Sequence, residues 1–215
     1  MKHAGGGMDS IANALFMADA IHYRKQKDCL TGRFMVPVYC DVRSLLGYPE
    51  YMNLVSDSIA AHIREAYPNT ESLVGIASSG IAFAALSARQ LNISTGFVRP
   101  HSKAYGLSRQ IEGLDVSDKL IVLVDDLVSS GGSVISAAGA LRDAGAQVSS
   151  AVCVMSYGFA ETVRHLQDTK LSLHSLTTIG EILDIGTRER WFEPRILDHI
   201  RLYLENPHSQ QWMRE

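Results

Sequence analysis

Short apolar runs that alternate with helical segments constrain the fold of this chain more than any other feature of its sequence. The runs lack strict alternation of apolar and polar residues, which is typical of parallel strands buried on both faces. We expect strands at 72–78, 93–99, 119–125, 146–156 and 171–178. Helical spacing predicts helices at 48–67, 80–91, 132–145 and 158–169. The alternation predicts an α/β fold, with a twisted, mostly parallel sheet and helices on both faces.

The two ends of the chain lie outside this alternation. Apolar residues at helical spacing predict a helix at 8–27, and the segment FMVPVYC at 34–40 predicts an edge strand, because Pro37 cannot donate a ladder hydrogen bond. One or two further helices are expected at 179–205. We interpret residues 1–7 as leader or tag residues, 8–45 as a small N-terminal hood, 46–185 as the core and 186–215 as a C-terminal helical segment.

Charge and composition exclude several classes of function. The net charge is −3, with acids and bases mixed along the chain, so no contact with nucleic acid is expected. No apolar run approaches the roughly 20 residues of a membrane helix, so no membrane contact is expected either. The three cysteines, Cys29, Cys40 and Cys153, are far apart and lack metal-ligand spacing. We therefore expect a protein of the reducing cytoplasm.

An acidic pair and a Ser/Gly turn follow the most apolar of the predicted strands. In KLIVLVDDLVSSGGSV, Asp125 and Asp126 come at the carboxyl end of the strand, and the turn leads into the next helix. Ligands of open α/β sheets bind outside the carboxyl ends of the strands. The glycines allow close backbone approach, and amide groups at a helix start bind anions. The residues of this predicted phosphate-binding turn are Ser129, Ser130, Gly131, Gly132 and Ser133.

The same run could also be an ordinary strand followed by a capped helix. We favour a ligand site because the acids, the turn and the small-residue helix occur together. The run lacks the lysine of a Walker loop and the G-x-G-x-x-G fingerprint of dinucleotide sites. Phosphate donors beside acceptors for sugar hydroxyls indicate a ribose 5-phosphate site.

This run resembles the phosphoribosyl pyrophosphate (PRPP) signature of the type I phosphoribosyltransferases. The resemblance implies the fold of that family. It also implies that Asp125 and Asp126 bind the ribose hydroxyls and that residues 129–133 bind the 5-phosphate.

Three further stretches resemble the orotate phosphoribosyltransferases. FVRPHSKAYGLSRQIEG at 97–113 is similar to their catalytic loop, and Arg99 and Lys103 match its basic residues. PVYCDVR at 37–43 is similar to a P-x-Y-x-D-x-R segment near the base site. GIASSGIAFA at 75–84 stands where the family binds pyrophosphate, so the resemblance gives that role to Ser78, Ser79 and Gly80.

The sequence also departs from the family pattern on the side of the base. No lysine precedes the 37–43 segment where many members have one, and Ser156-Tyr157-Gly158 replaces a common Asp-Arg. For Tyr39, Phe34 and Tyr157, stacking on a base and packing in the core are equally compatible with the sequence. We take these three as the tentative base site.

The resemblance implies transfer of ribose 5-phosphate from PRPP to orotate, with Mg²⁺ held through PRPP rather than by a protein cluster. It gives catalytic roles to Lys103, Arg99 and the aspartate pair, and it implies a homodimer. Two alternatives stay open. One is a phosphoribosyltransferase for another nucleobase, and the other is a non-catalytic regulator that senses PRPP.

Overall fold

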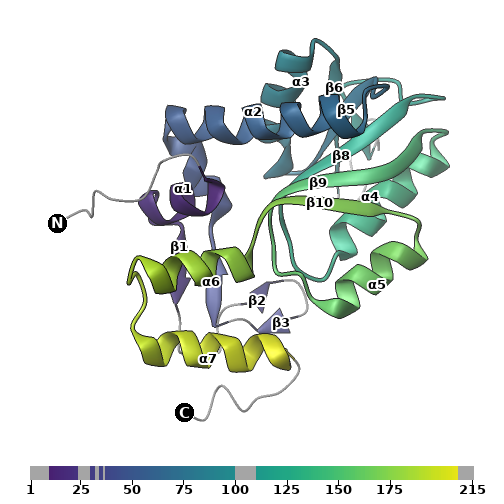
Figure 1. Ribbon diagram of the computed structural model, residues 1–215. Helices are drawn as coiled ribbons and strands as arrows, with labels where there is room; N and C mark the ends of the chain where they lie inside the picture. Colours follow the sequence, from purple (N-terminus) through teal and green to yellow (C-terminus); the bar gives the residue numbers. More distant parts are fainter. Residues whose placement is uncertain (1–9, 24–29, 32–33, 36, 100–109, 208–215) are drawn as a thin grey trace.

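The core of the protein is a six-stranded, mostly parallel sheet, as the sequence predicts (Figure 1). The computed structural model describes residues 10–23, 30–31, 34–35, 37–99 and 110–207. The strand order is β10-β9-β8-β5-β6-β7. The parallel strands are β5 (Ser72–Ile76), β6 (Ser94–Val98), β8 (Leu120–Val128), β9 (Gln147–Ser156) and β10 (Ser172–Thr178).

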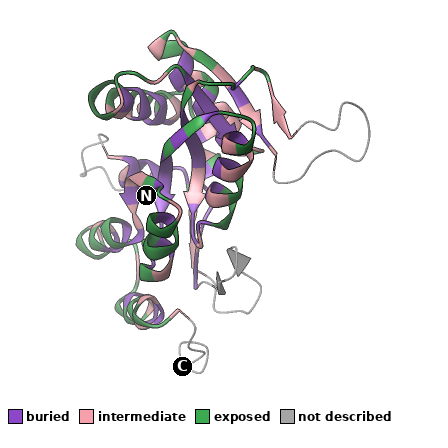
Figure 2. Cartoon of the chain, turned by 90° about the vertical axis from the view of Figure 1, so that its right-hand side faces the viewer, coloured by how far each residue is buried: buried purple, intermediate pink, exposed green. Residues whose placement is uncertain are grey.

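Helices cover both faces of the sheet, and each face has its own apolar cluster. Alternate strand residues point to opposite faces. Leu73 and Val122 therefore pack with α2 (Pro49–Ala66) and α3 (Gly80–Leu91), whereas Val74 and Leu123 pack with α4 (Gly132–Asp143) and α5 (Ala160–Asp168). Buried residues accordingly concentrate in the strands between the two helical layers (Figure 2). Burial on both faces explains why the strands read as apolar runs.

The N-terminal and C-terminal segments pack together beside the sheet (Figure 1). The elements are α1 (Ile11–Met17), β1 (Ile21–Tyr23), β2 (Leu30–Thr31), β3 (Phe34–Met35), β4 (Val38–Cys40), the 3-10 helix η1 (Val42–Gly47), α6 (Ile179–Arg188) and α7 (Pro194–Glu205). Phe16 of α1 stacks on Trp191 with ring centroids 5.2 Å apart. Tyr23 Oη and His199 Nδ1 are joined by a 2.7 Å hydrogen bond. The C-terminal helices are thus part of the same lobe as the N-terminal strands.

Three local expectations were wrong. The helix expected at 8–27 ends at Met17 because Asp19 adopts a left-handed conformation (φ 51°), and β1 follows. The strand expected at 34–40 is divided into β3 and β4, with Pro37, which has no N–H, between them. The polar, glycine-bearing segment at 100–118 lacks periodicity and predicts a long loop, but it contains β7 (Ile111–Glu112), which pairs antiparallel with β6.

Among the residues that the structure describes, no helix combines the length and the apolar character needed to cross a bilayer.

A stacked histidine pair joins α2 to β10. His62 of α2 lies on His174 of β10 with ring centroids 3.5 Å apart and planes 10° apart, and Tyr67 packs edge-on against His62. Burial lowers the pKa of both histidines; His174 lowers that of His62 further, and Glu65 partly opposes this. The unfolded chain therefore binds protons first as the pH falls through about 6.5.

We predict that thermal stability is complete above about pH 7 and decreases as the pH falls toward 5, because protonation of either ring is disfavoured only in the folded state. His174→Gln should flatten this dependence, measured by thermal unfolding across the pH series. His165→Gln, at an exposed site on α5, is the matched control and should retain it. Equal slopes for wild type and His174→Gln would contradict the role of the pair.

Candidate active site

The predicted ligand-binding loops meet at the point where the strand order of the sheet reverses. From β5 the chain continues to β6 on one side, whereas from β8 it continues to β9 and β10 on the other side. The loops after β5 and β8 therefore diverge from neighbouring strands at one edge of the sheet. In open α/β sheets this switch point is where ligands bind.

The aspartate pair stands just beyond the end of β5 but still inside β8. The ladder between β5 and β8 ends at Gly75 and Val124. The ladder with β9 continues to Val128, so the strand does not end at Asp125 as we expected from its sequence. The aspartate pair thus lies within the ladder between β8 and β9, but beyond the end of the ladder between β8 and β5.

The two carboxyl groups lie in different environments. Asp125 is buried, with 7% of its surface exposed, and its Oδ1 accepts a 3.0 Å hydrogen bond from the Asp126 amide. Burial, and then the neighbouring charge of Asp126, raises the pKa of Asp125 well above its ordinary value. Asp126 is half-buried. Asp126 is therefore the more accessible acceptor for hydroxyl groups of a ligand.

The Ser/Gly turn has the geometry of an anion-binding helix start. Gly131 adopts a left-handed conformation (φ 76°) as N-cap of α4, and no side chain of the described residues caps that helix. The turn packs against α5, because the Thr162 hydroxyl donates to the Ser129 carbonyl. Ser130 is half-buried and Ser133 exposed, whereas Ser129 is buried, so Ser129 is not a surface hydroxyl. Amide groups at an uncapped helix start favour a bound phosphate.

The predicted pyrophosphate loop lies directly beside the aspartate pair. The Ala77 amide donates a 2.9 Å hydrogen bond to the Val98 carbonyl, and the peptide bond between Ala77 and Ser78 is cis. A Cβ on Gly80 would overlap the Val124 carbonyl and lie 3.2 Å from the Asp125 Cα. The absence of a side chain at Gly80 thus allows the loop to contact the end of the β5–β8 ladder.

The structure describes only Arg99 of the two predicted catalytic cations. Arg99 lies on the β6–β7 side, where its Nε donates to Glu112 Oε1 at 2.8 Å and its guanidinium lies over Phe97. Its described side-chain contacts are thus at the β6–β7 edge of the sheet. Lys103 lies outside the described residues, so its role stays a prediction.

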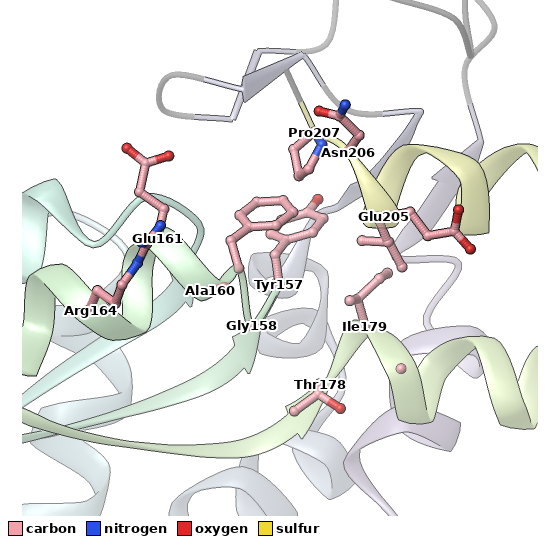
Figure 3. Close-up of a pocket in the computed structure, with 13 residues that line it drawn as sticks. Tyr157, Gly158, Ala160, Glu161, Arg164, Thr178, Ile179, Glu205, Asn206 and Pro207 are labelled. Carbon is pink, nitrogen blue, oxygen red and sulfur yellow. The ribbon is translucent and has the colours of Figure 1, made fainter. Parts of the chain in front are cut away.

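A cavity of about 730 Å³ lies where β9 and β10 end, beside the tentative base residue Tyr157 (Figure 3). The starts of α5 and α6 and the end of α7 form its walls, and its charged residues are Glu161, Arg164 and Glu205. Tyr157 is 4% exposed, and its hydroxyl donates a 2.7 Å hydrogen bond to the Val38 carbonyl. Tyr39 stands next to Val38 on β4. The side chain of Phe34 lies outside the described part of the chain.

Sequence reasoning missed two residues near the site. The hydroxyl of Thr162, on α5, donates a hydrogen bond to the Ser129 carbonyl, and no sequence motif in that helix pointed to it. Arg43 bonds both Asp41 and Tyr39, and only its position in the 37–43 segment could have indicated it. Among the described residues, no three histidine, cysteine, aspartate or glutamate side chains gather in a way that could hold a metal ion.

The comparisons with known proteins agree with this geometry. Residues 45–185 match the phosphoribosyl transferase domain family. The orotate phosphoribosyltransferase of Halalkalibacterium halodurans is 36% identical over 179 residues, which are 83% of this chain and 85% of that protein. That of Bacillus subtilis is 33% identical, with 83% of each chain covered.

Solved structures show the same fold. The orotate phosphoribosyltransferase of Aeropyrum pernix superposes with a TM-score of 0.73 at 26% identity, covering 85% of this chain and 99% of that one. The UMP synthase of Leishmania donovani gives 0.78 at 22% identity, covering 93% of this chain and 42% of that chain.

The mostly parallel open sheet, together with these matches, defines the type I phosphoribosyltransferase class. The chain belongs to the phosphoribosyltransferase family, and within it to the group of orotate phosphoribosyltransferases.

We predict that Gly80→Ala lowers both thermal stability and PRPP affinity, because its Cβ would meet the Val124 carbonyl. The matched control is Gly139→Ala, inside α4, where a Cβ meets nothing within 4 Å. That change should stabilise the protein by up to about 1 kcal/mol through helix propensity. Thermal unfolding and calorimetric titration with PRPP measure both effects. A Gly80→Ala protein with wild-type stability and affinity would contradict the close approach.

Proposed function

We propose that this chain transfers ribose 5-phosphate from PRPP to orotate, giving orotidine 5-phosphate and pyrophosphate. The observation that carries the proposal is the meeting of three parts at one switch point of the sheet: the loop at 78–80, the aspartate pair and the uncapped start of α4. Each part suits one portion of PRPP. We assign the 5-phosphate to residues 129–133, the ribose hydroxyls to the aspartate pair, and the pyrophosphate to Ser78, Ser79 and Gly80.

The leaving group requires positive charge, because pyrophosphate departs as the anomeric carbon becomes cationic. We assign this task to Lys103 and Arg99, as cations suit developing negative charge. For Arg99 the assignment requires its ion pair with Glu112 to exchange for the phosphates. Carboxylate oxygens beside ribose and phosphate oxygens fit Mg²⁺, which would neutralise part of the pyrophosphate charge and needs few protein ligands.

We assign the base to the region between β4, with Tyr39 and the neighbouring Phe34 of β3, and the turn after β9, with Tyr157. The hydrogen bond between Tyr157 and Val38 joins β4 to the turn after β9, which supports the assignment for Tyr39 and Tyr157. A homodimer remains part of the proposal because the family resemblance implies it, and a cytoplasmic location remains part of it because the three widely spaced cysteines suit a reducing compartment.

A base other than orotate is the second candidate. It is favoured by one observation: the charged residues that line the cavity beside Tyr157 are two glutamates and one arginine, which suits a carboxylate poorly. A PRPP-sensing regulator is the third, and a titration with DNA or RNA at physiological salt would test it.

The direct test is an assay of PRPP-dependent consumption of orotate beside uracil, hypoxanthine and adenine. The proposal expects turnover of orotate with release of pyrophosphate. Turnover of a purine or of uracil without orotate would replace it with the second candidate. Binding of PRPP with no turnover of any base would favour the regulator.

We predict that Asp126→Asn lowers PRPP affinity by about 10-fold or more, since a hydrogen bond to a charged group contributes about 1.5–3 kcal/mol. Asp125→Asn should have a smaller effect, because Asp125 is buried, with 7% of its surface exposed, and is less accessible to the hydroxyl groups of a ligand. Calorimetry with PRPP and Mg²⁺ measures both. Asp143→Asn, exposed at the end of α4, is the control. Unchanged affinity in Asp126→Asn would remove the ribose assignment.

We predict that Lys103→Ala lowers kcat by about 100-fold or more, the scale seen when one group that stabilises transition-state charge is removed. Thermal unfolding should stay unchanged, and Lys119→Ala, before β8, should retain wild-type turnover. Steady-state kinetics in both directions of the reaction provide the measurement. Wild-type kcat in Lys103→Ala would exclude this lysine from the mechanism.

A further inference from the structure

Arg43, in the first turn of η1, is held in a defined orientation although half of its side chain is exposed. Its Nε donates to Asp41 Oδ1 at 2.7 Å, and its Nη2 donates to the Tyr39 hydroxyl at 2.9 Å. In the described part of the chain its Nη1 group has no protein partner. A guanidinium fixed on two sides in this way presents its remaining N–H groups without further ordering of the side chain.

The backbone beneath Arg43 is anchored to both lobes. The buried Tyr157 hydroxyl, at the carboxyl end of β9, donates to the Val38 carbonyl at 2.7 Å, and the Tyr157 ring stacks on Phe159. On the other side, the Asp41 amide donates to the Ala20 carbonyl at 2.7 Å. Tyr157 therefore connects the sheet to the strand from which Tyr39 projects and Arg43 follows.

Arg43 also lies near the aspartate pair. The 3-10 helix η1 packs against β8, the strand that contains both aspartates. The hydrogen bond that Arg43 donates to Asp41 is the main cause that raises the pKa of Arg43, and the charge of Asp126 adds to it. Asp126 likewise contributes to the raised pKa of Cys40 on β4, after burial. The guanidinium is thus within electrostatic range of the carboxylate that we assign to the ribose.

We propose that Arg43 binds an oxyanion of the substrates, and that Asp41, Tyr39 and Tyr157 position it; the inference rests on the proposed function. The oxyanion is a phosphate of PRPP or the carboxylate of orotate, and both would be met by the same planar fork of donors. An exposed ion pair by itself contributes little to stability. Two features distinguish Arg43. Two side chains orient its guanidinium, and it lies in η1, which packs against β8, whereas Arg99 pairs with Glu112 at the β6–β7 edge of the sheet.

The test compares Arg43→Gln with Arg188→Gln, an exposed arginine of α6 whose ion pair within the described part of the chain is with its neighbour Glu189 at 3.0 Å. We expect Arg43→Gln to raise one KM by about 10-fold or more, with unchanged thermal unfolding, and Arg188→Gln to raise neither. A higher KM for PRPP identifies the phosphate, and a higher KM for orotate identifies the carboxylate. If both KM values stay within about twofold of wild type, the inference is wrong.

Two further variants separate binding from fold. Arg43→Lys retains the charge but loses the fork, so it should restore only part of the affinity. Tyr157→Phe should raise the same KM as Arg43→Gln by a smaller factor, and this increase should vanish when Arg43→Gln is already present. Additive effects in the double variant would remove Tyr157 from the positioning role. Full recovery in Arg43→Lys would remove the requirement for a fork.

Failure of the proposed function can be distinguished from failure of this inference. If the wild-type chain does not consume orotate, the proposed function is wrong. The role of Arg43 then depends on calorimetric binding of PRPP with Mg²⁺, which requires no acceptor base. Equal PRPP affinity in wild type and Arg43→Gln would in that case overturn it.

Discussion

The register between β5 and β8 is the constraint on which the site depends. The ladder between these strands ends at Gly75 and Val124, whereas β8 remains paired with β9 up to Val128. The backbone of the two aspartates is therefore extended and lies within the β9 ladder, but the β5 ladder ends before it. The loop after β5 packs on the β5 side of this backbone, because Gly80 has no side chain to separate it from the Val124 carbonyl. The aspartates of β8 and the backbone of the loop after β5 can lie side by side only because β5 ends before β8 does.

The second lobe depends on contacts between distant parts of the chain. Phe16 stacks on Trp191, and Tyr23 bonds His199, so the N-terminal strands and the C-terminal helices stabilise each other. Tyr157 then ties this lobe to the sheet through the Val38 carbonyl. A base bound between the lobes would contact residues that these three contacts hold in position. Because the contacts lie outside the strands of the main sheet, the same type of sheet can be combined with a different base-binding surface.

The sequence predicted the bounds of an element correctly where the local pattern was strong. Helix α3 begins and ends at the residues expected, because its helical spacing is bounded by loop signals at both ends. The helix over 8–27 was wrong because Ile21 continues the helical spacing, although Asp19 turns the chain into a strand. The expected end of β8 at Asp125 was wrong. Acidic residues are rare in strands, but pairing with β9 keeps Asp125 and Asp126 within β8, which continues to Val128.

By itself, the sequence determined the parallel α/β fold, the family and the order of the loops that we assign to a sugar phosphate. These properties follow from short-range patterns: apolar runs, glycine turns and an acidic pair. Only the tertiary structure decided that Asp125 is buried while Asp126 is accessible, that Arg99 pairs with Glu112, and that Arg43 is oriented by Asp41 and Tyr39. Such roles depend on strand register and on contacts between residues far apart in the chain, which no local pattern encodes.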